Sequence, residues 1–302
     1  MPSFKIDFMG KRNIMFAVSI VLIVVSLGAL FTRGLKFGIE FQGGTVVNIS
    51  SAGSADDAKV SKAFADAGLP NPQVQISIVN GVTGFLVRSD LTDSTKAQTI
   101  ADTAAKSLQL QEGSYQVTTI GPGWGKNITN SSSLAFALSI VAILLYVSLR
   151  FEYKMSVTAV VALIHDIIIT LGIYALFGRE VTPNTVAALL TILGFSLYDT
   201  IVVFHRIKEN AVGLVKQSFM SMANESINEV LIRSINTALT AVIPVLVMLF
   251  FGGSTLKDFA FALAIGTLSG SYSSIFVAAP LFAIWKETEP KFRALAKKLA
   301  NA

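Results

Sequence analysis

The sequence predicts a polytopic α-helical membrane protein with six transmembrane helices and a small α+β ferredoxin-like extracytoplasmic domain inserted after the first helix. Three observations lead to this fold class. The 302 residues are 52% hydrophobic and only 14% charged, which is too apolar for a soluble chain. Apolar runs of about 20 residues, the length that crosses a bilayer, recur along the chain. One polar segment, residues 34–126, interrupts them.

Composition also excludes several kinds of chemistry. The absence of cysteine removes disulfides, thiolate zinc sites, iron–sulfur clusters and catalytic thiols. His165 and His205 are the only histidines, and we predict neither a metal nor a cofactor. No catalytic triad order or metalloprotease motif is present, so we expect that the chain is not an enzyme. The 24 Lys and Arg residues form no continuous basic stripe, so we expect no nucleic-acid partner.

Six runs satisfy the length rule for a membrane span. The third and the fourth each contain one acid, Asp166 and Asp199, and the other four contain no charged residue. A signal peptide is the alternative for the first run, but its greater length and the lack of an A-x-A-like cleavage site favour a span. In chain order the runs cover residues 13–32, 127–149, 155–178, 181–204, 234–255 and 259–285.

The distribution of Lys and Arg near the ends of the spans predicts their orientation. Short loops on one side hold only Arg179 and Lys257, whereas the other side and both termini are rich in basic residues. We therefore expect both termini to be cytoplasmic. The expected organisation is 1–33 as the N-terminus and first helix, 34–126 as the extracytoplasmic domain, 127–286 as helices two to six, and 287–302 as a cytoplasmic basic tail.

The polar segment has the short periodic elements of a folded domain. Its order, strand-helix-strand-strand-helix-strand, is the ferredoxin-like pattern, which by itself names no function. Asn80-Gly81 predicts a hairpin turn between the second and third strands. The pair Gly43-Gly44 lacks phosphate-loop spacing, so we expect a bulge or a close backbone approach there. The strands are expected at 41–50, 73–79, 83–89 and 115–120, and the helices at 55–68 and 94–110.

Ionisable residues inside the spans are the most informative about function. A carboxylate at the centre of a membrane helix costs about 2.5 to 3.5 kcal/mol on insertion scales, so an acid there is a functional hypothesis. Asp199 lies close to Ser196 and Thr200 on its helix, and Asp166 directly follows His165. The alternative is structural, because these groups could satisfy one another or hydroxyls of neighbouring helices and hold the bundle together.

Arg233 is a candidate charge partner for Asp199. It begins the fifth span on the side where the fourth span ends, about one and a half turns beyond Asp199, so the two could meet. Snorkelling of Arg233 to the lipid headgroups is the alternative. Asp199 and Arg233 are therefore a candidate pair of interacting charges at the cytoplasmic side of the bundle.

Two further patterns concern helix packing. Ile227, Val230 and Leu231 predict an amphipathic helix at the cytoplasmic interface before the fifth span. A stripe of small residues at intervals of four in the sixth span predicts close packing, either within the chain or on a partner subunit. The stripe consists of Ala262, Gly266, Gly270, Ser274 and Ala278.

Several motifs, in the right order over nearly the whole chain, resemble the SecF subunits of the SecD/SecF family. Each motif alone is weak, but together they are specific. They are Phe37-Gly-Ile-Glu-Phe-Gln-Gly-Gly-Thr45, His165-Asp166, Gly194-Phe-Ser-Leu-Tyr-Asp-Thr200 through Arg206-Ile-Lys-Glu-Asn210, Phe251-Gly-Gly253 and Tyr272-Ser-Ser-Ile275.

The resemblance implies half of a fold similar to the resistance-nodulation-division transporters, in the bacterial cytoplasmic (inner) membrane. It implies pairing with a SecD-like homologous subunit beside the SecYEG channel, with YajC as a further partner. The implied role is to promote export of preproteins with the proton gradient. The first alternative is a proton-driven solute or lipid exporter of the same superfamily, and the second is a scaffold of the translocon that transports nothing.

The resemblance also assigns roles to residues. Asp199 falls on the family's fourth-span aspartate, which is implicated in proton passage, and Arg233 falls on its fifth-span arginine. Tyr198 and His205 depart from the family pattern, where asparagine and an acid are common. The resemblance thus implies that Asp199 and Arg233 form a proton relay, in which protonation biases a bundle with two states. The supporting polar residues that we expect around this relay are His165, Asp166, Ser196 and Thr200.

Overall fold

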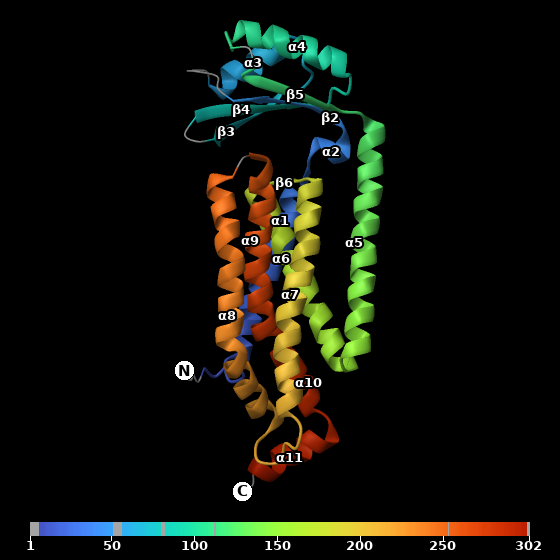
Figure 1. The fold of residues 1–302 in the computed structure, drawn as a ribbon, viewed down its shortest axis with the longest axis vertical. Helices are drawn as coiled ribbons and strands as arrows, with labels where there is room; N and C mark the ends of the chain where they lie inside the picture. The colour runs from blue at the N-terminus through green and yellow to red at the C-terminus, as the bar shows by residue number, and fades with distance from the viewer. Residues whose placement is uncertain (1–5, 51–55, 80–81, 112, 253, 301–302) are drawn as a thin grey trace.

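The computed structural model describes residues 6–50, 56–79, 82–111, 113–252 and 254–300. A long helical bundle carries an α+β domain at one end (Figure 1). The start of the first helix and the C-terminal helix α11 (Pro290–Ala300) both lie toward the end opposite this domain (Figure 1). The two ends of the described chain are therefore on the same side of the bundle.

Six helices of the described chain are long and apolar enough to cross a membrane, as the sequence predicts. Local signals set several of their ends: Thr182 forms a capping box, and Gly178 ends its helix in the left-handed conformation. The last span is broken into three consecutive segments by a π-helix. The spans are α1 (Arg12–Arg33), α5 (Pro122–Arg150), α6 (Tyr153–Phe177), α7 (Pro183–Asn210), α8 (Phe219–Phe251) and the series α9 (Ser254–Ser273), η1 (Ser274–Ala278) and α10 (Ala279–Glu287).

The fifth span differs most from its prediction. Helix α8 already begins at Phe219, where Ser218 caps it by accepting a hydrogen bond from the Ser221 amide. The prediction of a separate interfacial helix before this span is wrong, because the apolar residues on which it rested belong to α8 itself. Ile227, Val230 and Leu231 are buried in the core of the bundle rather than facing lipid.

The α+β domain has the element order that the sequence predicts. Its strands form an antiparallel sheet in the order β3-β4-β2-β5, and two helices pack on one face (Figure 1). Val47, Phe64 and Val87 lie in the core between these layers. The Asn80-Gly81 turn lies outside the described residues. The elements are β2 (Gly44–Ile49), α3 (Asp57–Asp66), β3 (Gln73–Val79), β4 (Val82–Ser89), α4 (Ser94–Ser107) and β5 (Tyr115–Ile120).

The start of the first long strand is corrected by the structure. Phe41 belongs to a short helix, α2 (Ile39–Gln42), and the strand begins only at Gly44. Gly44 has a φ of +130°, and a Cβ there would lie 2.6 Å from the carbonyl oxygen of Ser89. The expected close backbone approach at the glycine pair is confirmed. A Cβ on Gly125 of α5 would lie equally close to the carbonyl oxygen of Phe41, so α2 and α5 also meet backbone to backbone.

A short parallel pair that the sequence did not predict ties the domain's connector to the bundle. Strand β1 (Lys36–Phe37) follows α1, and β6 (Glu180–Val181) precedes α7. The Gly38 amide extends the pair by donating to the Val181 carbonyl at 2.9 Å. Next to it, Arg88 of the domain forms an ion pair with Glu180. The domain thus meets the bundle through the backbone hydrogen bonds of its connector and through the Arg88–Glu180 ion pair.

Candidate functional site: a buried polar core in the helical bundle

The small residues of α9 bring its backbone against α7. A Cβ on Gly266 would lie 2.2 Å from Ile192 Cδ1, and one on Gly270 would lie 2.8 Å from Ser196 Cβ. The stripe therefore packs within this chain, which decides between the two alternatives left open by the sequence. Because the two helices approach so closely, polar side chains of α7 and α9 can meet in the interior.

Asp166 of α6 is hydrogen-bonded from several sides in this interior. It is fully buried, and its carboxylate accepts hydrogen bonds from hydroxyls of Ser196, Ser269 and Ser273 at 2.6 to 2.8 Å. Nδ1 of His165 lies 3.1 Å from the same carboxylate. Asp166 thereby holds α6 to both α7 and α9. Ser269 and Ser273 were not predicted, although their spacing of four places them on one face of α9.

Asp199 of α7 has a much poorer environment. Its side chain is 3% exposed, and Oδ1 accepts a hydrogen bond from Ser234 of α8 at 2.7 Å. Its other oxygen, Oδ2, is buried and has no hydrogen-bond partner among the described residues. A buried polar atom without a partner is costly in a protein interior. Of the two intramembrane acids, Asp199 is the one whose carboxylate is incompletely hydrogen-bonded among the described residues.

Arg233 lies beside Asp199 but is bound elsewhere. Its guanidinium donates to the Tyr198 hydroxyl at 3.1 Å, and both side chains are exposed on the outside of the bundle. No ion pair connects Arg233 to Asp199 in the part of the chain described, since the neighbouring Ser234 supplies the donor instead. Tyr198, one of the departures from the family pattern, therefore holds the arginine that was expected to pair with Asp199.

Hydroxyl groups connect the surroundings of the two acids. Thr200 lies next to Asp199, and its hydroxyl is 2.8 Å from that of Ser274. Ser274 and Thr200 both bond the carbonyl oxygen of Ser196, whose own hydroxyl donates to Asp166. Ser274 is also the first residue of the π-helix η1, a local widening that is often found at functional sites.

His165 extends the polar core toward α1. Its ring stacks on Tyr272 with centroids 6.1 Å apart, and Tyr272 donates to the carbonyl oxygen of Met15. Nε2 of His165 is buried and has no partner in the described chain. The sequence-predicted residues His165, Asp166, Ser196, Asp199 and Thr200 therefore lie in one interior, whereas Arg233 lies at its edge. Such an arrangement can hold or pass a proton between buried groups.

The fold and this core define a class of protein. A bundle of six spans with ionisable residues in its interior, joined to one domain outside the bundle, is typical of half of an ion-coupled membrane transporter. The chain matches the family described as protein export membrane protein SecD/SecF, C-terminal, over residues 100–288. It also matches the SecD/SecF GG motif over residues 28–53. The chain belongs to the SecD/SecF family.

Similar sequences carry the same family name. The chain is 39% identical over 301 residues to the protein translocase subunit SecF of Streptomyces coelicolor, covering 97% of this chain and 80% of that protein. It is 35% identical over 278 residues to SecF of Pseudomonas aeruginosa, covering 90% and 89%. It is also 33% identical to the protein translocase subunit SecDF of Thermus thermophilus, covering 93% of this chain and 39% of that protein.

Solved structures agree with the fold. The crystal structure of SecDF from Thermus thermophilus, described as a translocon-associated membrane protein, matches with a TM-score of 0.85 over 94% of this chain. The super-membrane-facing form of SecDF matches with a TM-score of 0.68 over 99%. This chain spans about two fifths of either SecDF chain, so it corresponds to one part of a longer polypeptide there.

Proposed function

We propose that this chain is a SecF-type subunit of the Sec protein translocase, which uses the proton gradient to promote protein export. The observation that carries the proposal is the environment of Asp199. This acid is buried in the bundle, and one of its carboxylate oxygens has no hydrogen-bond partner in the described part of the chain. A guanidinium lies close by, bound to the Tyr198 hydroxyl. The names of the relatives support the translocase role, and the buried acid supports the coupling to protons.

The proposed location is the bacterial cytoplasmic membrane, with both termini in the cytoplasm. Helix α11 and the start of α1 lie at the same end of the bundle, and the α+β domain lies at the other end (Figure 1). This arrangement supports the proposed topology. That domain is proposed to be a ferredoxin-like extracytoplasmic domain. We expect it to contact unfolded preprotein through its sheet edges, where backbone groups are free to pair.

A SecD-like subunit is the proposed partner in the membrane. The outer face of α7 and α8 exposes Thr191, Tyr198, Arg233 and Asn236, which are unusual residues to present to lipid. Gly194 lies between them, and a Cβ there would meet no atom of the described residues within 4 Å. A small residue flanked by polar ones suits the close approach of another helix. The SecYEG channel, YajC and the exported preprotein are proposed from the family alone.

The proposed mechanism uses two positions of the Arg233 guanidinium. An ionised Asp199 would attract it, whereas a protonated Asp199 would leave it on Tyr198. Movement of the guanidinium between these two positions would favour one of two arrangements of α7 packed on α8. One charge that crosses the membrane field gains about 2.3 kcal/mol per 100 mV, which corresponds to a shift of roughly 50-fold in an equilibrium between two states.

The test replaces Asp199 with asparagine, which keeps the size of the side chain but cannot ionise. D199N should reach normal abundance and lose the stimulation of preprotein export by the proton gradient. Asp66 is an exposed acid of the α+β domain, so D66N serves as the matched control and should export normally. Full gradient-dependent export by D199N would favour a translocon scaffold. A lack of any effect of the chain on preprotein export would favour a solute or lipid exporter.

A further inference from the structure

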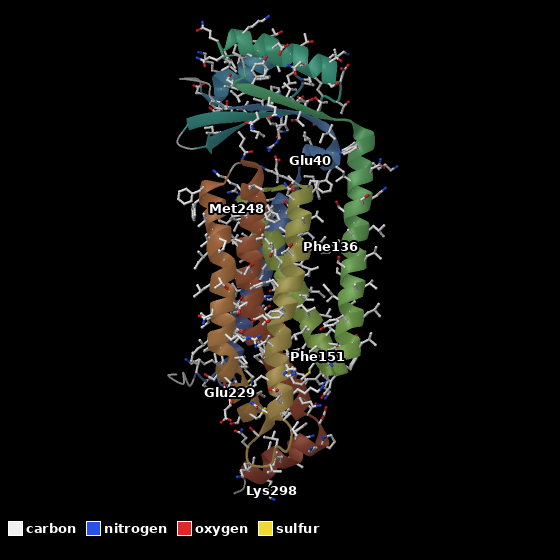
Figure 2. The ribbon with its side chains drawn as sticks, viewed as in Figure 1. Glu40, Phe136, Phe151, Glu229, Met248 and Lys298 are labelled. Atoms are coloured by element: carbon white, nitrogen blue, oxygen red, sulfur yellow. The ribbon has the colours of Figure 1, made fainter. Side chains whose placement is uncertain are left out.

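A groove separates α5 from the rest of the bundle on the side of the α+β domain. Its volume is about 480 Å³, and its floor includes Ile167 and Leu171 of α6 and Leu189 of α7. Phe136 of α5 forms part of the facing wall (Figure 2). Figure 1 shows α5 standing apart from α7 here, while α2 links its upper end to the domain.

Apolar side chains are also exposed on the outer faces of the helices that form the groove. Leu138 of α5 is 59% exposed and Ile164 of α6 is 51% exposed, and both residues lie within membrane spans. Water does not fill an apolar groove stably, and an empty groove forfeits the dispersion contacts of its walls. Hydrocarbon of the surrounding bilayer can supply those contacts.

The end of the groove nearest the domain carries hydroxyl groups beside the aromatic side chains of Phe37 and Phe41. Ser132 and Ser133 of α5 line it together with Thr129. Lys126 lies one turn before Thr129 on α5 and is exposed, and no hydrogen bond or ion pair connects it to another described residue. Trp124 is 63% exposed nearby, as is usual for tryptophan at a membrane interface. An anionic group held above an apolar tail fits this arrangement.

We propose that the groove binds one phospholipid from the leaflet on the side of the domain. One acyl chain lies against Ile167, Leu171 and Phe136, and the phosphate contacts Lys126 and the hydroxyls of Ser132 and Ser133.

The walls favour a lipid over a polypeptide segment. A peptide at this depth must have its backbone amides and carbonyls paired, either internally or by the groove. The floor residues Ile167, Leu171 and Leu189 are apolar, and the polar side chains of the lining are limited to those of Gln42, Thr129, Ser132 and Ser133. An acyl chain needs no such partners. Because the tail leaves one apolar medium for another, selectivity for a bound lipid comes from the phosphate contacts and from filling the groove.

Native mass spectrometry of the full chain, purified in mild detergent with added phosphatidylglycerol or phosphatidylethanolamine, tests the proposal. The unmodified chain should retain one phospholipid. L171W places an indole in the groove and should abolish retention. L138W puts the same side chain on the exposed face of α5 outside the groove and should retain the lipid. Equal retention by L171W and L138W would overturn the assignment.

A second variant avoids any change to the core. Lys126 is exposed, so K126E should fold normally and weaken binding of both phospholipids by at least about tenfold. Diacylglycerol has the same tails without the phosphate, so it should bind weakly to the unmodified chain and to K126E alike. Retention of detergent alone, binding of diacylglycerol as tight as that of the phospholipids, or crosslinking of a protein helix in the groove would each refute the proposal.

Discussion

The contact between Gly172 of α6 and Ser26 of α1 allows a sharp test of helix packing. A Cβ on Gly172 would lie 2.1 Å from the Cβ and 2.4 Å from the Cα of Ser26. Carbon atoms that are not bonded prefer separations of about 3.5 to 4.0 Å. Since the Cα of Ser26 is backbone, no change of side-chain rotamer relieves the clash. The variant G172A therefore requires α1 to move by roughly 1 Å relative to α6.

The expected size of the effect follows from two opposing contributions. Alanine is favoured over glycine within a helix by about 1 kcal/mol. Overpacking of a close contact costs about 1 to 3 kcal/mol, and a backbone clash belongs at the upper end of that range. The free energy of unfolding of G172A should therefore fall by about 2 kcal/mol. A Cβ on Gly28 of α1 meets nothing within 4 Å, so G28A should gain the helix preference alone.

Equilibrium unfolding in detergent, followed by circular dichroism, measures both variants. The difference between G172A and G28A should be about 3 kcal/mol. A second readout is the contact of α1 with Tyr272, whose hydroxyl donates to the Met15 carbonyl. Cysteines introduced at positions 15 and 272 should crosslink less readily in the G172A background. Equal stability of the two glycine variants would show that α1 does not lie this close to α6.

Two further predictions concern topology and the junction between the domain and the bundle. In intact cells, S94C should react with an impermeant maleimide, whereas K216C should react only after permeabilisation. The chain has no native cysteine that could react in the background. The reverse labelling pattern would overturn the topology. Burial raises the pKa of Glu180 above the ordinary glutamate value although Arg88 opposes the shift, so the folded state favours the protonated acid. The contribution of Glu180 to stability is therefore complete below the unfolded pKa of about 4.3 and is lost as the pH rises through the raised folded pKa. Unfolding midpoints of the unmodified chain and of E180Q, compared from pH 4 to pH 8, should converge at low pH and favour E180Q at neutral pH; parallel profiles would contradict this assignment.

The membrane spans and the order of the domain's elements could be predicted because both follow from local patterns. Apolar length identifies a span, and alternation identifies a strand, without knowledge of the rest of the chain. The pair β1–β6 could not be predicted in this way. Each strand has two residues, and Lys36 meets Glu180 only because the bundle brings them together. The first turns of α8 were expected as a separate interfacial helix because they are apolar on one face only, and the sequence did not show that they continue into the fifth span.

In the candidate site, too, some features follow from local sequence and others depend on tertiary packing. Asp166 and Asp199 could be recognised as buried acids, because a charge within an apolar run is evident from the sequence. Their different degrees of satisfaction could not be predicted, since Asp166 depends on Ser269 and Ser273 of another helix. The position of Arg233 depends on the Tyr198 hydroxyl, one helix away. Hydrogen-bond partners are set by tertiary packing rather than by local sequence.

The parallel pair β1–β6 has a mechanical consequence for the helix that carries Asp199. Val181 accepts a hydrogen bond from Gly38, and α7 begins two residues later at Pro183. The connector continues through α2 into β2, the strand that lies inside the sheet. Few freely rotating bonds therefore separate the first turn of α7 from the domain. If α7 tilts, either the sheet must move together with α7, or the hydrogen bonds between the connector and β6 must break.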